Sequence, residues 1–178
     1  MTNLIRKDSD QALATQEQVG QYLTFLVEKE SFAISILDVK EIIEIANVTR
    51  VPLTPDYIHG VINLRGNVVP VIDLSARLKH RVAEVGKRSC IVLVEIDIPE
   101  GAQLIGMLVD EVREILEIPP TNIQPAPDFG TDIRTDFIQA MARVGEVFII
   151  LLAINHVLSL EELSQLSGIA KASELINA

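Results

Sequence analysis

One pattern of residues occurs twice in this chain. Residues 38–45 read Asp-Val-Lys-Glu-Ile-Ile-Glu-Ile, and residues 111–118 read Glu-Val-Arg-Glu-Ile-Leu-Glu-Ile, so the two octets match in chemical type at every position. A solenoid repeats every 20 to 50 residues or so, and this spacing is longer. The sequence therefore predicts one β-rich unit used twice in a single compact body. The agreement extends outward on both sides: 22–27 with 91–96, and 66–72 with 145–151.

The composition favours sheets. Of the 178 residues, 48% are hydrophobic but only 4% are aromatic, and tryptophan is absent. Most of the apolar residues are Ile, Val and Leu, and β-branched side chains suit strands better than helical bundles. This length fits one domain, or two small units that share a core.

The charge excludes several classes of partner. The formal net charge is −10. Nucleic-acid affinity comes largely from Lys and Arg that displace counterions, so we expect no nucleic-acid partner, and docking on an anionic membrane surface is disfavoured for the same reason. The longest apolar stretch, 147–154, is too short to span a bilayer. No signal-peptide pattern is present at the N-terminus, so the sequence predicts a cytoplasmic protein with no direct membrane insertion.

The chain divides into four parts. Residues 1–18 are polar and aperiodic and are expected to form a flexible tail. The first unit is expected over about 19–88 and the second over about 89–158, followed by a C-terminal helix and tail over 159–178. Strands are predicted at 21–27, 31–36, 42–48, 90–96, 103–109, 111–118, 138–144 and 147–154, with a hairpin between 60 and 74.

Local signals mark turns and helix ends. Gly66-Asn67 is predicted to be a tight hairpin turn. Pro70 cannot donate to a ladder, so the returning strand is expected to be an edge, at least at that residue. A helical turn is expected over 37–41 and a short helix over 74–78. Ser159-Leu-Glu-Glu162 is a capping-box pattern, which predicts the start of the C-terminal helix.

Each unit thus has about five short strands, too few to shield both faces of an open sheet. Closing each sheet into a small barrel removes the exposed edges. Two such barrels packed together would bury a third apolar layer between them. We therefore expect a mainly β fold of two five-stranded barrels with short helices.

Catalytic and metal-binding patterns are missing from the sequence. His59, His80 and His156 are dispersed and lack metal-ligand spacing to any cysteine or paired carboxylate. Cys90 is the only cysteine and lies in an apolar run, which indicates a buried free thiol. The sequence therefore predicts no catalytic residues, no metal, no cofactor and no enzyme activity.

One hairpin gives the chain a recognisable family character. The segment 60–74, Gly-Val-Ile-Asn-Leu-Arg-Gly-Asn-Val-Val-Pro-Val-Ile-Asp-Leu, resembles the CheW-like family of bacterial chemotaxis coupling proteins. Blocks at 32–42, 106–127 and 137–158 resemble the family in the same order. The resemblance covers about residues 19–165, and its most specific part is the Asn-Leu-Arg-Gly turn.

The resemblance implies both a fold and a role. It implies two SH3-like barrels, in agreement with the duplication. It also implies an adaptor that joins the cytoplasmic tip of methyl-accepting chemoreceptors to the regulatory domain of a chemotaxis histidine kinase, at receptor arrays. No cofactor is expected.

Five residues are candidates for partner binding. In the family, the arginine that matches Arg65 is associated with partner binding and faces the acid that corresponds to Glu41; a solvent-exposed ion pair is the structural alternative. Val39 is assigned to a receptor-facing groove by resemblance alone. Gly60 is expected to need an unusual φ or a close approach, and Thr49 lies on an irregular loop, where binding residues concentrate. Turn chemistry would explain Thr49 equally well.

Three alternatives remain open at this stage. The first is a coupling protein of a non-flagellar chemosensory pathway, such as one governing twitching motility. The second is an enzyme built on a double barrel. The third is a lone regulatory domain of a kinase or response protein, against which the lack of a receiver-like or ATP-binding segment counts.

Overall fold

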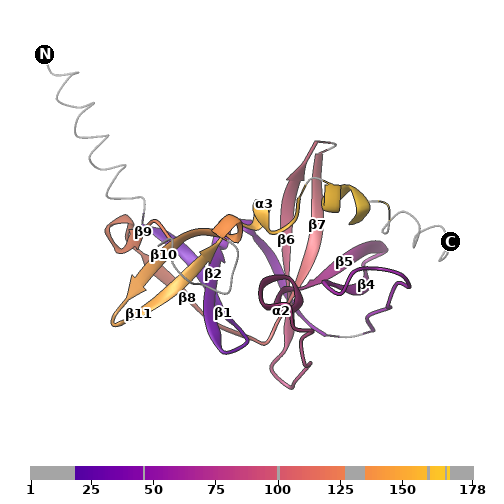
Figure 1. The fold of residues 1–178 in the computed structure, drawn as a ribbon, viewed down its shortest axis with the longest axis horizontal. Coiled ribbons are helices and arrows are strands. Elements are labelled where there is room, and N and C mark those ends of the chain that lie inside the picture. The colour runs from indigo at the N-terminus through magenta and orange to yellow at the C-terminus, as the bar shows by residue number, and fades with distance from the viewer. Residues whose placement is uncertain are drawn as a thin grey trace, which may run out of the picture.

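The computed structural model describes residues 19–45, 47–99, 101–126, 135–159, 161–166 and 168, and shows two β-rich lobes side by side (Figure 1). The tail predicted at 1–18 and the end of the chain at 169–178 lie outside the described residues. In the first half, the elements are β1 (Gly20–Val27), β2 (Glu30–Ser35), η1 (Ile36–Asp38), β3 (Val39–Glu44), β4 (Ile58–Leu64), β5 (Asn67–Asp73) and α2 (Leu74–Lys79).

The second half repeats this order of strands and adds the short strand β9. Its elements are β6 (Cys90–Ile98), β7 (Gly101–Val109), β8 (Glu111–Ile118), η2 (Pro120–Asn122), β9 (Ile123–Gln124), η3 (Thr135–Phe137), β10 (Ile138–Val144), β11 (Val147–Leu152) and α3 (Ile154–Val157). Residues 161–166 are helical as well. The fold class is therefore the predicted one, mainly β with short helices.

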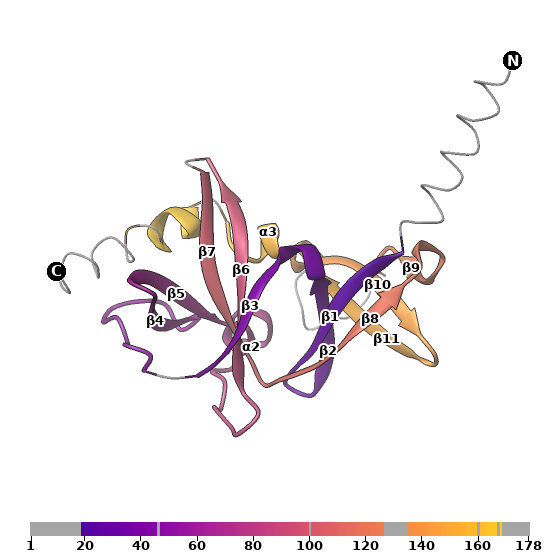
Figure 2. The ribbon, with the colours of Figure 1, turned by 180° about the vertical axis from the view of Figure 1, so that it is seen from behind.

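The strands form two sheets that each combine both halves of the chain. One sheet has the order β8-β1-β2-β11-β10-β9 and the other has the order β3-β6-β7-β5-β4. Figure 2 shows the exchange, with β3 running beside β6 in one lobe and β8 beside β1 in the other. The units of about 19–88 and 89–158 therefore describe the repeat in the sequence, whereas each sheet takes strands from both.

Each sheet closes on itself through the chain that leaves its edge strand. Beyond β3, Thr49 forms an isolated antiparallel bridge with Val61 of β4, the strand at the opposite edge of the same sheet. Beyond β8, the two-residue strand β9 pairs with β10 in the corresponding place. Closure leaves fewer unpaired edges exposed than an open sheet of the same length, which supports the predicted pair of barrels. We call the β3–β4 sheet barrel B and the β8–β9 sheet barrel A.

The two exchanged strands, β3 and β8, pair with their neighbours in equivalent registers. Val39 of β3 lies opposite Val94 of β6, and Val112 of β8 lies opposite Phe25 of β1, with a register shift next to each pair. At the register shift between β1 and β8, the Thr24 hydroxyl donates to the Glu114 carbonyl at 2.8 Å and accepts from the Glu114 amide at 3.1 Å. The hydroxyl thus pairs backbone groups at an irregular point of the ladder.

Buried apolar side chains form three clusters. In β6, Ile91 and Leu93 face one cluster while Val92 and Val94 face another, because successive side chains of a strand point to opposite sides. The cluster with Ile91 includes Ile62, Val69, Val71 and Leu108 of barrel B, and a matching cluster on the barrel A strands includes Ala33, Ala142, Ile149 and Leu151. The largest cluster draws on strands of both barrels and on Leu163 and Leu166, which is the third apolar layer that the sequence predicted.

Several local predictions need correction. The first hairpin turns at Arg65-Gly66 and not at Gly66-Asn67, because Leu64 pairs with Asn67, the first residue of β5. Strand β5 as a whole is not an edge strand, but the prediction holds at Pro70 itself, which pairs with Val61 of β4 while the parallel ladder with β7 begins at Val71. Strand β3 begins at Val39 and not at residue 42, since the preceding turn ends at Asp38, and it ends at Glu44.

Candidate partner-binding site

Arg65 and Glu41 form the ion pair that the sequence suggested. The Nη2 atom of Arg65 donates to Oε1 of Glu41 at 2.9 Å. Glu41 belongs to β3 and Arg65 to the β4–β5 turn, which are remote in the order of the sheet but meet where barrel B closes. The Arg65 side chain is 72% exposed, so most of its guanidinium surface is open to a partner.

The hairpin presents Arg65 from a constrained backbone. Arg65 and Gly66 both have positive φ, +51° and +85°, as a two-residue hairpin turn of the primed type requires. The Asn63 side chain accepts a hydrogen bond from the Gly66 amide at 3.0 Å and fastens the turn. The β10–β11 hairpin, which matches this one in the repeat, turns at residues 145–146, and Gly145 occupies its first turn position with φ +63°. The residue equivalent to Arg65 is therefore Gly145 itself, not the Val144 that alignment of the two repeats suggests.

Thr49 and Gly60 lie together beside this pair. The backbone of Thr49 exchanges two hydrogen bonds with Val61, of 2.9 Å and 2.8 Å. A Cβ atom on Gly60 would lie only 2.5 Å from the Thr49 carbonyl oxygen and 2.7 Å from Cγ1 of Val48. Close approach therefore explains the glycine, as the sequence predicts. We use the name closing seam for Glu41, Thr49, Gly60 and Arg65, which all lie where barrel B closes.

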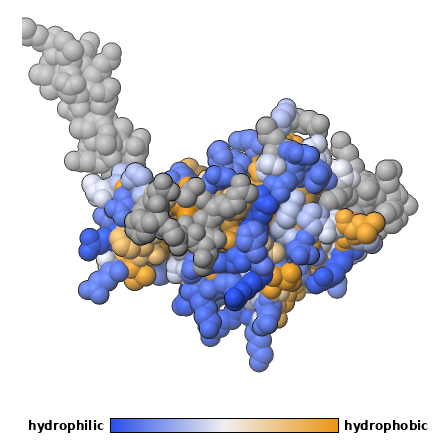
Figure 3. Space-filling view, viewed as in Figure 1, coloured by the Kyte–Doolittle hydropathy of each residue, from blue (hydrophilic) through white to orange (hydrophobic). Residues whose placement is uncertain are grey.

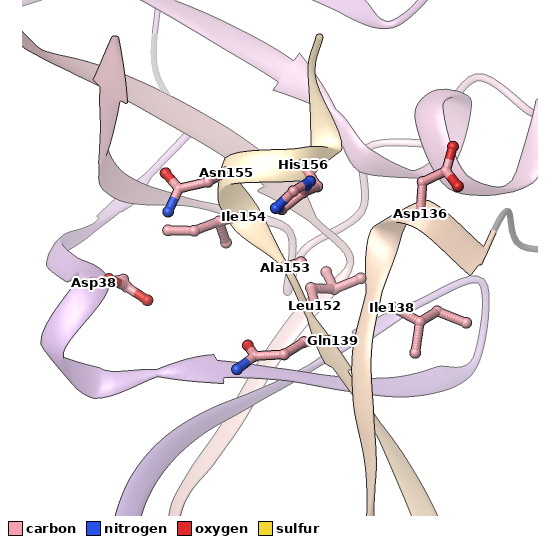
Figure 4. A pocket seen from close by; sticks show the side chains of 9 residues that line it. All are labelled: Asp38, Asp136, Ile138, Gln139, Leu152, Ala153, Ile154, Asn155 and His156. Carbon is pink, nitrogen blue, oxygen red and sulfur yellow. The ribbon is translucent and has the colours of Figure 1, made fainter. Parts of the chain in front are cut away.

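Val39 lies apart from the closing seam, at the margin of a groove. A groove of about 460 Å³ runs between η1 on one side and η3, β10, the end of β11 and α3 on the other (Figure 4). Its lining residues are Asp38, Asp136, Ile138, Gln139, Leu152, Ala153, Ile154, Asn155 and His156. Val39 directly follows Asp38 and packs against the large core cluster without lining the groove.

The polar lining gives the groove an acidic character. Asp38 and Asp136 stand on opposite walls in Figure 4, with the amides of Gln139 and Asn155 between them. Burial, followed by repulsion from Asp97, raises the pKa of Asp38 above its ordinary value, although Lys40 opposes the change. The lining is thus more polar than that of a typical small-molecule site.

Exposed apolar side chains accompany these polar groups. Leu37 of η1 is 86% exposed and Ile42 of β3 is 43% exposed, whereas Ile43 packs against the barrel B core. The structure thus separates two isoleucines that the sequence could not distinguish. Over the face drawn in Figure 3, hydrophilic side chains dominate and the hydrophobic patches are small and separate.

Sequence reasoning missed Asp38 and Asn63. Asp38 has no sequence signal beyond its place in the repeated octet, since nothing in the sequence reveals a groove between barrels. Asn63 had a usable signal, because an asparagine three residues before a glycine often accepts its amide in a turn. Among the described residues, no group of three or more His, Cys, Asp or Glu side chains is arranged to hold a metal ion. None of the described helices has the length and apolarity needed to cross a membrane.

Two linked barrels with a charged seam and a shallow groove define a protein suited to contact with other proteins. The chain belongs to the CheW-like domain family, whose model matches residues 21–162.

The chain is similar to named proteins and to solved structures. The chain is 34% identical to "Chemotaxis protein CheW" from Klebsiella aerogenes, a match that covers 88% of this chain and 92% of that protein. It is 31% identical to "Protein FrzA" from Myxococcus xanthus, over 76% of this chain and 82% of the relative. The crystal structure of the scaffolding protein TtCheW from Thermoanaerobacter tengcongensis has a TM-score of 0.71 and 32% identity, covering 80% of this chain and 89% of that one.

Proposed function

We propose that the protein is a noncatalytic cytoplasmic adaptor that couples methyl-accepting chemoreceptors to the regulatory domain of a chemotaxis histidine kinase within receptor arrays. The names of the relatives, a chemotaxis protein and a scaffolding protein, support this role. In this proposal Glu41 and Arg65 orient a partner at the closing seam, with Thr49 and Gly60 holding the seam in shape. Val39 and the groove beside it receive the receptor tip.

One structural observation carries the assignment of the binding residues. Arg65 occupies a left-handed turn position where the β10–β11 hairpin has Gly145, and its side chain is largely exposed beside Glu41. Arginine is enriched at interface hot spots because its planar guanidinium combines charge, donors and stacking area. Glu28 has the same left-handed conformation, φ +50°, in the β1–β2 turn, so the support for a binding role of Arg65 comes from its exposed guanidinium at the closing seam and not from its backbone.

The test is a pull-down with a soluble receptor-tip fragment and a histidine kinase, used separately and together. We expect recovery of a ternary complex with the unmodified protein. Arg65→Ala is expected to weaken association about tenfold or more, which corresponds to about 1.4 kcal/mol, while the melting temperature stays nearly unchanged because an exposed pair contributes about 0–1 kcal/mol.

Arg143→Ala is the matched control for this variant. Arg143 is an exposed arginine on the β10–β11 hairpin, and its Nε donates to the nearby Gly145 carbonyl at 3.3 Å. We expect it to bind partners like the unmodified protein. A large loss of stability with intact binding in Arg65→Ala would make Arg65 a structural residue and refute the assignment.

A second candidate is a coupling protein of a non-flagellar chemosensory pathway, such as one governing twitching motility. The similarity to FrzA favours it. Both candidates predict receptor and kinase binding, so the discriminating measurement is the phenotype of a deletion strain. Loss of swimming chemotaxis supports the first candidate, and loss of surface motility control with normal swimming supports the second.

A further inference from the structure

Arg77 of α2 lies between two aromatic rings and binds two further segments of the chain. Its guanidinium carbon is 4.9 Å from the centre of the Tyr57 ring and 5.0 Å from the centre of the Phe137 ring. Its Nε donates to the Val157 carbonyl at 2.8 Å, and its Nη2 donates to Glu162 at 2.7 Å. The Arg77 side chain is only 15% exposed, so these contacts are largely shielded from water and salt.

The carboxylate of Glu162 extends this network into the C-terminal helix. It accepts hydrogen bonds from the Ser159 amide at 2.9 Å and from the Tyr57 hydroxyl. Burial, and after it the charge and hydrogen bond of Glu162, raises the pKa of Tyr57 to about 12, so this hydroxyl keeps its proton at neutral pH. The network therefore joins α2, the segment before β4, η3, α3 and the helix at 161–166.

The same network lies directly behind one wall of the groove. Phe137 stands between Asp136 and Ile138, which line the groove, and Val157 follows the lining residues of α3. The Ala153 amide donates to the Phe137 carbonyl at 3.0 Å, which ties η3 to the start of α3. Because Arg77 contacts both Phe137 and Val157, it fixes the two segments that form this wall.

We propose that Arg77 is a positioning residue for partner binding, which holds η3 and α3 in the arrangement that the receptor tip recognises. This inference rests on the proposed function of the groove. Arginine is required because a planar guanidinium stacks between two rings while it donates in two directions. Lysine carries the same charge but lacks both the plane and the fork.

Arg77→Lys tests the inference with a readout that needs no partner. We expect hydrogen exchange at the amides of Ala153 and His156, which bond within this wall, to become about tenfold faster or more. Amides in the β6–β7 ladder should keep their protection. The dissociation constant for a soluble receptor-tip fragment is expected to rise about tenfold, measured at a temperature at which the variant is fully folded.

The controls separate this inference from the proposed function. Arg88→Lys changes an exposed arginine paired with Glu111 and should alter neither exchange nor affinity. Glu162→Gln removes one charge with little change of shape, and should shift both readouts in the same direction even if Arg77→Lys fails to fold. Unchanged exchange in the wall, or faster exchange with unchanged affinity, overturns the positioning role. Absence of receptor binding by the unmodified protein refutes the proposed function, and the exchange result then decides only whether Arg77 holds the wall.

Discussion

Arg65 adopts a backbone conformation that costs free energy in the folded state. A non-glycine residue in the left-handed region costs about 1–2 kcal/mol, whereas an exposed ion pair contributes about 0–1 kcal/mol. The bond to Glu41 therefore offsets at most part of the strain of the turn, a cost that Glu28 also bears at φ +50° in the β1–β2 turn. Gly145 fills the equivalent position of the other hairpin, with φ +63°, without this cost.

Arg65→Gly is expected to separate stability from binding. Glycine adopts the turn without strain, so the free energy of unfolding should stay the same or rise by about 0.5–1 kcal/mol. Partner affinity should fall as in Arg65→Ala. Urea denaturation and binding measurements on the same preparation check both halves. A loss of more than about 1 kcal/mol of stability would show that the side chain supports the fold.

Gly60→Ala is expected to damage the fold, and binding with it. The new methyl group would meet the Thr49 carbonyl oxygen at 2.5 Å, which is backbone and cannot rotate away. The bridge between Thr49 and Val61 should break, with a loss of about 1–3 kcal/mol in the free energy of unfolding. Gly145→Ala is the control, since its Cβ would have no neighbour within 4 Å and tests a left-handed backbone alone. Equal losses in the two variants would contradict the role of close approach.

At the level of elements, local signals in the sequence identified most strands, the helix at α2 and the capping box at Ser159. In that box, the Glu162 amide donates to the Ser159 hydroxyl at 3.1 Å, and Glu162 accepts from the Ser159 amide. The position of the β4–β5 turn was predicted wrongly, because Arg65 takes a left-handed conformation that residue preference assigns to Gly66 or Asn67. Strand β9 was missed, since its pairing partner β10 lies in a different part of the chain.

The prediction of site residues from sequence was also limited where contacts join distant parts of the chain. The Glu41–Arg65 pair was expected from the family resemblance, and the structure brings the two side chains together. The lining of the groove beside Val39 was not predictable, because its residues come from η1, η3, β10, the end of β11 and α3, whose proximity depends on the packing of two barrels. The exchange of β3 and β8 is a non-local pairing for the same reason, and no period within either strand reveals its neighbour.

The contribution of the C-terminal helix to the stability of the fold should depend on pH through the ionisation of Glu162. Burial acts to raise its pKa, but hydrogen bonds from Ser159, the charge of Arg77 and the bond from Tyr57 outweigh it, so the pKa lies below the ordinary value of 4.5. A carboxylate with a depressed pKa in the folded state stabilises the fold above its unfolded pKa and loses that contribution as pH falls through the folded pKa. We therefore expect the stability difference between the unmodified protein and Glu162→Gln to be constant near neutral pH and to shrink below about pH 4.5.

This comparison also removes the effect of other carboxyl groups. Burial raises the pKa of Asp38 and of Asp110, which favours the fold as pH falls, but both groups are present in the two proteins. Urea denaturation at several pH values between 3 and 8 or so gives the difference directly. A gap that stays constant into the acid range would show that the charge of Glu162 does not hold the helix.

For the whole molecule, the exchange of β3 and β8 makes the two barrels one folding unit. Barrel B lacks an edge strand without β3, barrel A lacks one without β8, and the largest core cluster draws on both. We therefore expect a single cooperative unfolding transition for the protein, and no cooperative unfolding for fragments 19–88 and 89–158 studied separately. Mixing the fragments should restore native-like circular dichroism and one transition, because the β3–β6 and β1–β8 ladders then form between them. Two separate transitions in the unmodified protein, or a stable fold in either fragment alone, would show that each half of the chain closes its own barrel without the strand it receives from the other.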